Sequence, residues 1–303
     1  MRGPLWVLLN GKFKKRHFVL NSQCLCWYKS KGAKQPTKWV SLAWKVIRPF
    51  IDQGDNEQVR YGFSIETEET NQEFYTVDPA YLNDWVLALH PITFFTDFAA
   101  DYEFGDRLGK GTYASVYSVS DRNTAEVFAA KVVNTEDLSV RSLAALRNEV
   151  KILREVSHPK LVRLHRTYVE GHQLILVMEC VSTRNLQHFI SQMNSFSEQA
   201  AVGFATDMLE VLQYLHTRGI IHRDIKPENI LLRNNCLDGG VLADFGFACY
   251  DSHQPKLRCG SPGYVAPEVL SAHTYGTKVD VFGLGVVLHI LLTGCSPFQG
   301  SRM

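Results

Sequence analysis

Apolar and polar positions alternate along residues 1–77 with a period of two, which is the pattern of half-buried β-strands. The alternating runs are short, rich in β-branched and aromatic residues, and separated by Asn-Gly, Lys-Gly or charged turns. They predict six or seven strands, represented by residues 5–9, 17–20, 25–28, 39–42, 61–65 and 73–77. The period then changes, and Leu82, Trp85 and Leu89 fall at helical spacing, which predicts one amphipathic helix over residues 80–90.

From Tyr102 onward, strands alternate with longer helices. Residues 116–119, 127–133 and 174–178 have the short apolar pattern of strands, and residues 141–156 have the spacing of an amphipathic helix. The longest apolar stretch, residues 281–292, is interrupted by two glycines and a histidine and is too short to cross a bilayer. The pattern as a whole predicts an α+β protein.

Length and composition indicate two globular domains. The chain has 303 residues, of which 45% are hydrophobic and 21% charged, so a disordered or fibrous chain is excluded. We place the domains at residues 1–91 and 102–303. Residues 92–101 join them and carry three phenylalanines, so we expect this linker to pack against one of the domains. Seven scattered cysteines fit neither a disulfide framework nor zinc spacing, which favours a reducing compartment and a cytoplasmic protein.

The charges are segregated, although the formal net charge is only +1. Residues 1–50 contain eleven Lys and Arg and no acid, residues 51–101 contain one Arg and eleven acids, and residues 102–303 balance at 20 against 20. The neutral total argues against a nucleic-acid partner. The basic first block predicts affinity for an anionic membrane surface, whereas the alternative is an ordinary solvated strand face.

Four features of the first domain carry a family resemblance. They are Gly3-x-Leu5, the Phe13-Lys-Lys-Arg-His-Phe-Val-Leu20 run, Trp27-Tyr28-Lys29, and Trp85 in the closing helix. Over residues 1–91 the chain resembles a pleckstrin homology (PH) domain, a β-barrel capped by a C-terminal helix. The resemblance implies a lipid site in which an inositol phosphate is bound by Lys14, Arg16 and Tyr28. Val7 stands where many lipid-binding members have a further lysine, so a protein-binding or structural module is the alternative.

The second domain begins with a glycine-rich segment, Leu108-Gly-Lys-Gly-Thr-Tyr-Ala-Ser-Val116. Its glycines let backbone N–H groups approach the phosphates of a nucleotide, and Ala114 takes the place of a third glycine. A Rossmann unit would continue with a helix, but the pattern here continues as a strand. Lys131 lies in the next apolar strand, and Glu149 on the following helix is its expected partner at the α- and β-phosphates.

The most specific signal is His222-Arg-Asp-Ile-Lys-Pro-Glu-Asn-Ile-Leu231, followed by Asp244-Phe-Gly246 and Ala266-Pro-Glu268. In this order and spacing, the motifs are similar to those of eukaryotic serine/threonine protein kinases, which have a bilobal fold. Domain order resembles protein kinase B, whereas the Cys259–Glu268 run is closer to the calmodulin-dependent group, so the subfamily stays open.

The kinase resemblance implies ATP and Mg²⁺ as cofactors and protein Ser and Thr hydroxyls as acceptors. Asp224 would accept the proton of the attacking hydroxyl, Lys226 would neutralise charge on the transferred group, and Asn229 and Asp244 would bind the metal. The residues expected to act in catalysis are Asp224, Lys226, Lys131 and Glu149. Those expected to bind ATP are Leu108, Gly109, Lys110, Gly111, Thr112, Tyr113, Ala114, Ser115, Val116, Ala129, Lys131, Met178, Glu179, Val181 and Leu231.

The resemblance also implies an internal scaffold. The family stacks an apolar column between its lobes, which corresponds here to Leu153, Leu164, His222 and Phe245. Asp280, at the start of the last apolar helix, is expected to anchor this column by accepting backbone N–H groups around His222.

Two departures from the family pattern change the expectations. Leu257 stands where related kinases have a phosphorylatable threonine, so activation is expected not to need a phosphate there; Ser252 is the remaining candidate. In the family, three further helices follow the point that corresponds to residue 303. We therefore expect a kinase fold that lacks its last helices, with part of the cover missing from Val281, Leu284, Val287 and Leu291.

These observations leave two functions open. The first is an ATP-dependent serine/threonine kinase, cytoplasmic and brought to membranes as a peripheral protein by its PH domain. The second is a catalytically impaired, truncated adaptor at membranes that binds nucleotide without turnover.

Overall fold

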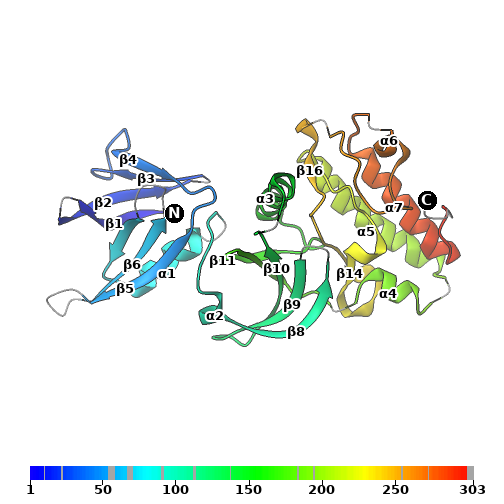
Figure 1. Cartoon of the computed structure of the whole chain (residues 1–303), viewed down its shortest axis with the longest axis horizontal. Helices are drawn as coiled ribbons and strands as arrows, with labels where there is room; N and C mark the ends of the chain where they lie inside the picture. The colour runs from blue at the N-terminus through cyan, green and yellow to red at the C-terminus, as the bar shows by residue number, and fades with distance from the viewer. Residues whose placement is uncertain are drawn as a thin grey trace. The chain divides into compact units, whose positions relative to one another are not determined.

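The computed structural model describes residues 1–9, 11–21, 23–53, 59–66, 71–89, 92–111, 114–136, 138–182, 184–193, 195–253, 255–271 and 273–298. The chain forms two compact units. One holds residues 1–126, 130–136 and 165–177, and the other holds residues 127–129, 137–164 and 178–303. Strands dominate the first unit and helices the second (Figure 1).

The N-terminal region is a single antiparallel sheet of seven strands. Their order in the sheet is β4-β3-β2-β1-β7-β6-β5. The strands are β1 (Arg2–Leu9), β2 (Lys12–Leu20), β3 (Cys24–Tyr28), β4 (Lys38–Ser41), β5 (Ile47–Gln53), β6 (Val59–Glu66) and β7 (Asn71–Thr76). The sequence pattern located all of them except β5, in which Pro49 interrupts the alternation. Proline is tolerated there because β5 is an edge strand.

Helix α1 (Pro79–Leu89) contacts β6 and β7 and encloses an aromatic core. Phe18 lies at the centre of this core, with ring centroids 5.4 Å from Phe74 and 6.5 Å from Trp85. Trp27 completes the group, and all four rings are buried. The expected sheet with a closing helix is therefore confirmed, and Trp85 is the residue by which the helix joins the core.

The linker is ordered and packs as expected. Phe94, Phe95 and Phe98 are buried, and residues 98–101 form the short helix α2. On one side, Ile47 donates its backbone N–H to Phe94 at 2.8 Å. On the other side, Phe95 donates to Thr167 at 2.9 Å, within a strand of the second sheet. The linker thus shares backbone hydrogen bonds with both sheets, which explains why it is too apolar for a free tether.

A second sheet of five strands follows, in the order β11-β12-β10-β9-β8. Its strands are β8 (Tyr102–Lys110), β9 (Ala114–Asp121), β10 (Val127–Asn134), β11 (Leu164–Glu170) and β12 (Gln173–Glu179). Helix α3 (Val140–Glu155) lies between β10 and β11 in the chain, and its N-cap Ser139 accepts a hydrogen bond from the backbone of Ser142.

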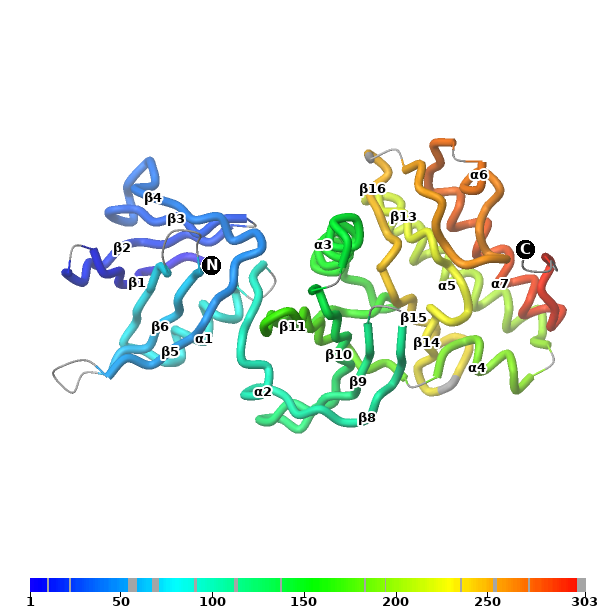
Figure 2. Tube along the Cα trace, viewed as in Figure 1, coloured from blue at the N-terminus to red at the C-terminus, as the bar shows by residue number. Residues whose placement is uncertain are grey.

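The rest of the second unit is mainly helical. Its helices are α4 (Leu186–Ile190), α5 (Glu198–His216), α6 (Pro267–Leu270) and α7 (Lys278–Thr293). Two small two-stranded sheets connect the loops between these helices. The first pairs β13 (Ile220–Ile221) with β16 (Cys249–Tyr250), and the second pairs β14 (Ile230–Leu232) with β15 (Gly240–Leu242) (Figure 2).

Helices α5 and α7 pack side by side (Figure 1), and this contact corrects one expectation. Leu284, Val287 and Leu291 were expected to have lost part of their cover, but they are at most 2% exposed in a helix that packs against α5. Val281 does remain 48% exposed. No helix within the described ranges has the length and apolar character needed to cross a membrane.

Candidate active site

The loop between β13 and β14 is held by one buried carboxylate. Asp280, 1% exposed on α7, accepts the backbone N–H of His222 at 2.9 Å and that of Arg223 at 2.8 Å. His216 on α5 approaches the same carboxylate at 2.9 Å. Arg223 has a left-handed backbone with φ of 68°, a strained conformation that the two Asp280 bonds help to maintain. The expected hydrogen bonds from the backbone around His222 to Asp280 are confirmed.

Asp224 follows directly and is only 3% exposed. Its Oδ2 lies 2.8 Å from Lys226 Nζ and 2.9 Å from Asn229 Nδ2, and the same amide nitrogen donates to the Asp224 carbonyl at 2.9 Å. The other carboxylate oxygen, Oδ1, is buried and has no hydrogen-bond partner within the described residues. A buried carboxylate oxygen without a donor costs free energy, and such atoms often mark a functional site.

Asn229 and Asp244 leave the same end of the β14–β15 hairpin. Ile230, next to Asn229, pairs with Leu242, two residues before Asp244. Ala243 donates its N–H to the Asn229 carbonyl at 2.8 Å. Asp244 has a left-handed φ of 61°, and its Oδ1 accepts the N–H of Gly246 at 3.3 Å. The hairpin register therefore brings together the backbones at two residues that are fifteen positions apart in the sequence.

The residues around this hairpin include three predicted members of the site. The Phe245 ring lies 5.1 Å from His222, and both are fully buried, as expected for the apolar column. Glu149 on α3 is 4% exposed, and a Cβ placed on Gly246 would lie 3.8 Å from its Oε2. The Glu149 carboxylate thus lies beside the Asp244-Phe-Gly246 turn.

The predicted adenine-binding residues of the second unit lie on β12 and β14. Met178 and Glu179 end β12 and are half-buried, and Val181 follows them. The Glu179 carboxylate pairs with Arg233 at 2.5 Å, and its backbone N–H bonds to Arg163 at 2.9 Å. Leu231 is half-buried on β14. These contacts fix the chain at the end of β12.

The glycine-rich segment is a hairpin between β8 and β9. Lys110 pairs with Ser115 and Gly109 with Val116, and Gly111 donates to the Ala114 carbonyl at 2.7 Å. Leu108 precedes the turn on β8. Thr112 and Tyr113, two of the predicted nucleotide-binding residues, lie outside the described residues. A strand follows the turn, so the Rossmann alternative is excluded as the sequence indicated.

Two further predicted residues lie on β10. Ala129 and Lys131 are both half-buried there. Lys131 and Glu149 belong to different compact units, so their pairing stays a prediction.

In the first sheet, the predicted lipid residues do not share one face. Lys14 pairs with Val7 and Arg16 with Leu5, whose side chains are buried, so both cations lie on the core side of the strands. Tyr28 pairs with His17, one position out of phase, and therefore lies on the opposite face.

Of the two neighbouring β3 aromatics, Trp27 and not Tyr28 lies on the side of Lys14 and Arg16, because it pairs with Phe18. Lys38 extends over the Trp27 ring at 5.8 Å. Neither Trp27 nor Lys38 could be placed beside Lys14 and Arg16 from the sequence, because strand parity cannot be assigned before the register is known.

Comparison with known proteins agrees with the geometry. A model described as the protein kinase domain matches residues 102–303, two thirds of the chain. The chain belongs to the protein kinase family. A second model, described as the PH domain, matches residues 1–93 of this kinase.

The curated relatives of the kinase carry protein kinase names. It is 38% identical to calcium/calmodulin-dependent protein kinase type II alpha chain of Drosophila melanogaster, over 67% of this chain and 39% of the relative. It is 38% identical to calcium/calmodulin-dependent protein kinase type 1 of Caenorhabditis elegans, over 65% and 57% respectively. It is 37% identical to myosin light chain kinase A of Dictyostelium discoideum, over 69% of this chain and 72% of the relative. The chain thus spans less than two thirds of the length of the first two.

Membership of the kinase family implies ATP and a divalent metal, and the residues of the β14–β15 hairpin fit such a metal. Both hydrogen bonds of the Asn229 side chain use its nitrogen, which leaves its amide oxygen as a ligand among the described contacts. Asp244 supplies a carboxylate. Mg²⁺ typically binds one or two protein oxygens together with substrate phosphates. Within the described residues no group of three or more His, Cys, Asp or Glu side chains gathers.

Proposed function

We propose that this chain transfers the γ-phosphoryl group of ATP to serine and threonine hydroxyls of proteins with the help of Mg²⁺. The observation that carries the proposal is the asymmetric environment of Asp224. One of its oxygens is held by Lys226 and Asn229, while the other is buried without a donor. That second oxygen suits the hydroxyl proton of an acceptor, because a hydroxyl would supply the missing hydrogen bond.

Each site residue has a role in this proposal. Asp224 orients the acceptor hydroxyl and takes its proton as the oxygen bonds to the γ-phosphorus and the bond to the β–γ bridging oxygen breaks. Lys226 offsets negative charge on the transferred group. Asn229 and Asp244 hold Mg²⁺, which screens the phosphate charges when bound.

The nucleotide is bound by the remaining predicted residues. Lys131, oriented by Glu149, reaches the α- and β-phosphates, and the backbone of the 108–116 hairpin covers them. Val116, Ala129 and Leu231 contact the adenine ring, next to the Met178–Val181 backbone.

The choice of acceptor residue concerns Lys226, which is not one of the residues proposed to bind the metal. Lys226 Nζ donates to Ser261 Oγ at 2.6 Å, which ties the catalytic loop to the segment before Ala266-Pro-Glu268. This bond fixes one wall where an acceptor peptide would lie, close to Asp224. A lysine at the position of Lys226 is typical of serine/threonine-directed members of the family, so we expect Ser or Thr rather than Tyr as the acceptor.

The test is phosphoryl transfer from γ-labelled ATP to basic peptides that differ only in one acceptor residue. We expect label on the Ser and Thr peptides, far less on the Tyr peptide, and none on the Ala peptide. Preferential labelling of the Tyr peptide would contradict the proposed specificity. Nucleotide binding with no label on any peptide would favour the impaired adaptor instead.

We also propose that the N-terminal domain brings the kinase to anionic membranes as a peripheral, cytoplasmic protein. Lys14 and Arg16 project from the core face of β2, with Trp27 and Lys38 on the same side. Arg16 Nε is buried without a hydrogen-bond partner in the described part of the chain. A phosphorylated inositol headgroup would supply acceptors for these cations.

Two adjacent lysines provide a matched pair for the membrane test. Lys15 lies on the outer face, 5.8 Å from the Trp6 ring, whereas Lys14 lies on the core face. In vesicle sedimentation, Lys14→Ala should weaken binding to phosphatidylinositol bisphosphate about fivefold, since one basic residue contributes about 1 kcal/mol at an anionic surface. Lys15→Ala should leave the preference for this lipid over phosphatidylserine unchanged. Equal losses would indicate attraction by charge alone, and no binding by the wild type would favour a protein-binding module.

A further inference from the structure

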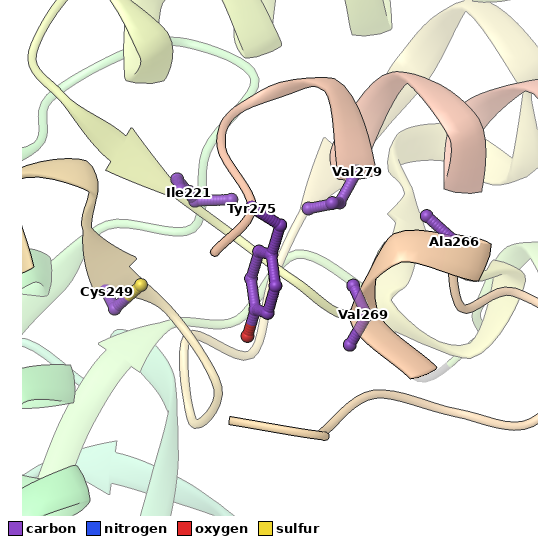
Figure 3. Packing of buried hydrophobic residues seen from close by; sticks show 6 residues of the cluster. All are labelled: Ile221, Cys249, Ala266, Val269, Tyr275 and Val279. Carbon is purple, nitrogen blue, oxygen red and sulfur yellow. The ribbon is translucent and has the colours of Figure 1, made fainter. Parts of the chain in front are cut away.

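Tyr275 lies in the loop between α6 and α7, three residues before α7 begins. It is 5% exposed and packs in a cluster with Ile221, Cys249, Ala266, Val269 and Val279 (Figure 3). The cluster joins β13, β16, α6 and α7, so the ring is fixed by elements of the helical unit. We call residues 247–265 the activation segment; within it, 254 lies outside the described residues.

The Tyr275 hydroxyl connects the activation segment to the catalytic loop. It donates to the Leu257 carbonyl at 2.6 Å and accepts from Arg223 Nη1 at 3.0 Å. The Tyr275 backbone N–H bonds to Pro255 at 3.2 Å, and Cys259 Sγ lies 3.7 Å from the hydroxyl. Burial raises the pKa of Tyr275, and the nearby Arg223 guanidinium lowers it. Burial has the larger effect, so the pKa is about 12. The hydroxyl therefore keeps its proton at neutral pH and can make both bonds at once.

In the described contacts the Arg223 side chain donates to neutral oxygens. Its Nε donates to the Phe247 carbonyl at 2.6 Å, at the start of the activation segment, and its Nη1 donates to Tyr275. Within the described residues no carboxylate forms an ion pair with it. Arg223 immediately precedes Asp224, so whatever fixes this guanidinium also fixes the catalytic loop. Leu257, held by the same hydroxyl, cannot be phosphorylated.

We infer that the Tyr275 hydroxyl is a positioning group that fixes the activation segment to Arg223 and so removes the need for a phosphate on that segment. The hydroxyl binds the two partners that an activating phosphate would have to bring together, Arg223 and the backbone at Leu257. Ser261, four residues beyond Leu257, is thereby kept within reach of Lys226. This inference rests on the proposed kinase function only for its effect on rate, because the segment is held whether or not phosphoryl transfer occurs.

Tyr275→Phe removes the hydroxyl and keeps the ring that fills the cluster. In the full chain, we expect kcat for a Ser peptide to fall about tenfold, the loss expected for one hydrogen bond that involves a charged group. The KM for the peptide should rise and the KM for ATP should stay unchanged. Tyr214→Phe is the matched control, because its hydroxyl accepts one backbone hydrogen bond at 2.8 Å from Ser157 on another part of the same unit. It should leave both constants unchanged.

Limited trypsin digestion tests the same contact by a readout that does not depend on kinase activity. Lys256 and Arg258 are exposed on either side of Leu257, so cleavage after them reports release of the segment. We expect faster cleavage at these two sites in Tyr275→Phe and wild-type rates in Tyr214→Phe. An inactive wild type whose cleavage is still accelerated by Tyr275→Phe would contradict the kinase function and support the positioning contact. Equal cleavage in wild type and Tyr275→Phe would overturn the inference.

A rescue distinguishes positioning from general stability. In the Tyr275→Phe background, Leu257→Glu should restore kcat, because a carboxylate at 257 offers Arg223 a charged partner in place of the hydroxyl. A double variant as slow as Tyr275→Phe would contradict this role. Phosphatase-treated wild type should retain its activity. An obligatory phosphate on Ser252 or elsewhere in residues 247–258, found by mass spectrometry of the active protein, would overturn the inference.

Discussion

Asp224→Asn should lower kcat by about 10²–10⁴-fold, the range expected when a general base is removed. The amide keeps the shape of the side chain but cannot accept the hydroxyl proton. It must also direct an oxygen toward Lys226 and Asn229, both of which donate to the present Oδ2. Its NH₂ group would then occupy the place of Oδ1, where it would meet the acceptor hydroxyl as a donor. Both the protonation and the orientation of the acceptor are therefore lost.

The measurement is the initial rate of peptide phosphorylation together with ATP binding by calorimetry. ATP affinity should be nearly unchanged, because Asp224 contacts neither the proposed adenine residues nor Asp244 in the described contacts. Asp238→Asn, a change at an exposed carboxylate of the same unit, is the control and should match the wild type. Equal rates for Asp224→Asn and wild type would show that a co-purifying kinase makes the label, and the proposed function of this chain would fall.

Residues of the candidate site could be grouped from the sequence where they lie close together within one motif. Asp224, Lys226 and Asn229 are close in the chain, and the turn between β13 and β14 brings them within hydrogen-bond distance. Asp244 was also located, because it begins the Asp244-Phe-Gly246 motif, and the resemblance placed Asp280 at the start of the last apolar helix. The roles of these residues remain proposals, but their arrangement in the second unit is the one that the motifs implied.

Contacts that depend on register or on long-range packing could not be predicted. Tyr28 was grouped with Lys14 and Arg16, although strand parity places it on the other face of the sheet. The burial of Leu284 depends on α5, about seventy residues earlier, and no local pattern reveals that contact. Tyr275 belongs to no motif used in the prediction. Its importance appears only once the fold brings Arg223 and Leu257 to its hydroxyl.

Asp280→Ala should lower the free energy of unfolding by about 3–5 kcal/mol, since a buried carboxylate is removed from three donors at once. The backbone N–H groups of His222 and Arg223 would be left buried without acceptors, and His216 would lose its partner. The strained left-handed backbone at Arg223 would also lose one of the contacts that maintain it. Thermal unfolding should show a drop in Tm of roughly 10 °C.

Asp207→Asn is the matched control for this prediction. Asp207 also pairs with a cation of the same unit, Lys160, but both side chains are partly exposed at 20% and 27%. Its replacement should cost no more than about 1 kcal/mol, as for a surface ion pair. Below its Tm, Asp280→Ala should also have a reduced kcat with little change in the KM for ATP, because the loop that carries Asp224 is no longer fixed. If Asp280→Ala were no less stable than Asp207→Asn, the anchoring role of Asp280 would be wrong, and the order of the catalytic loop would have to come from the β14–β15 hairpin alone.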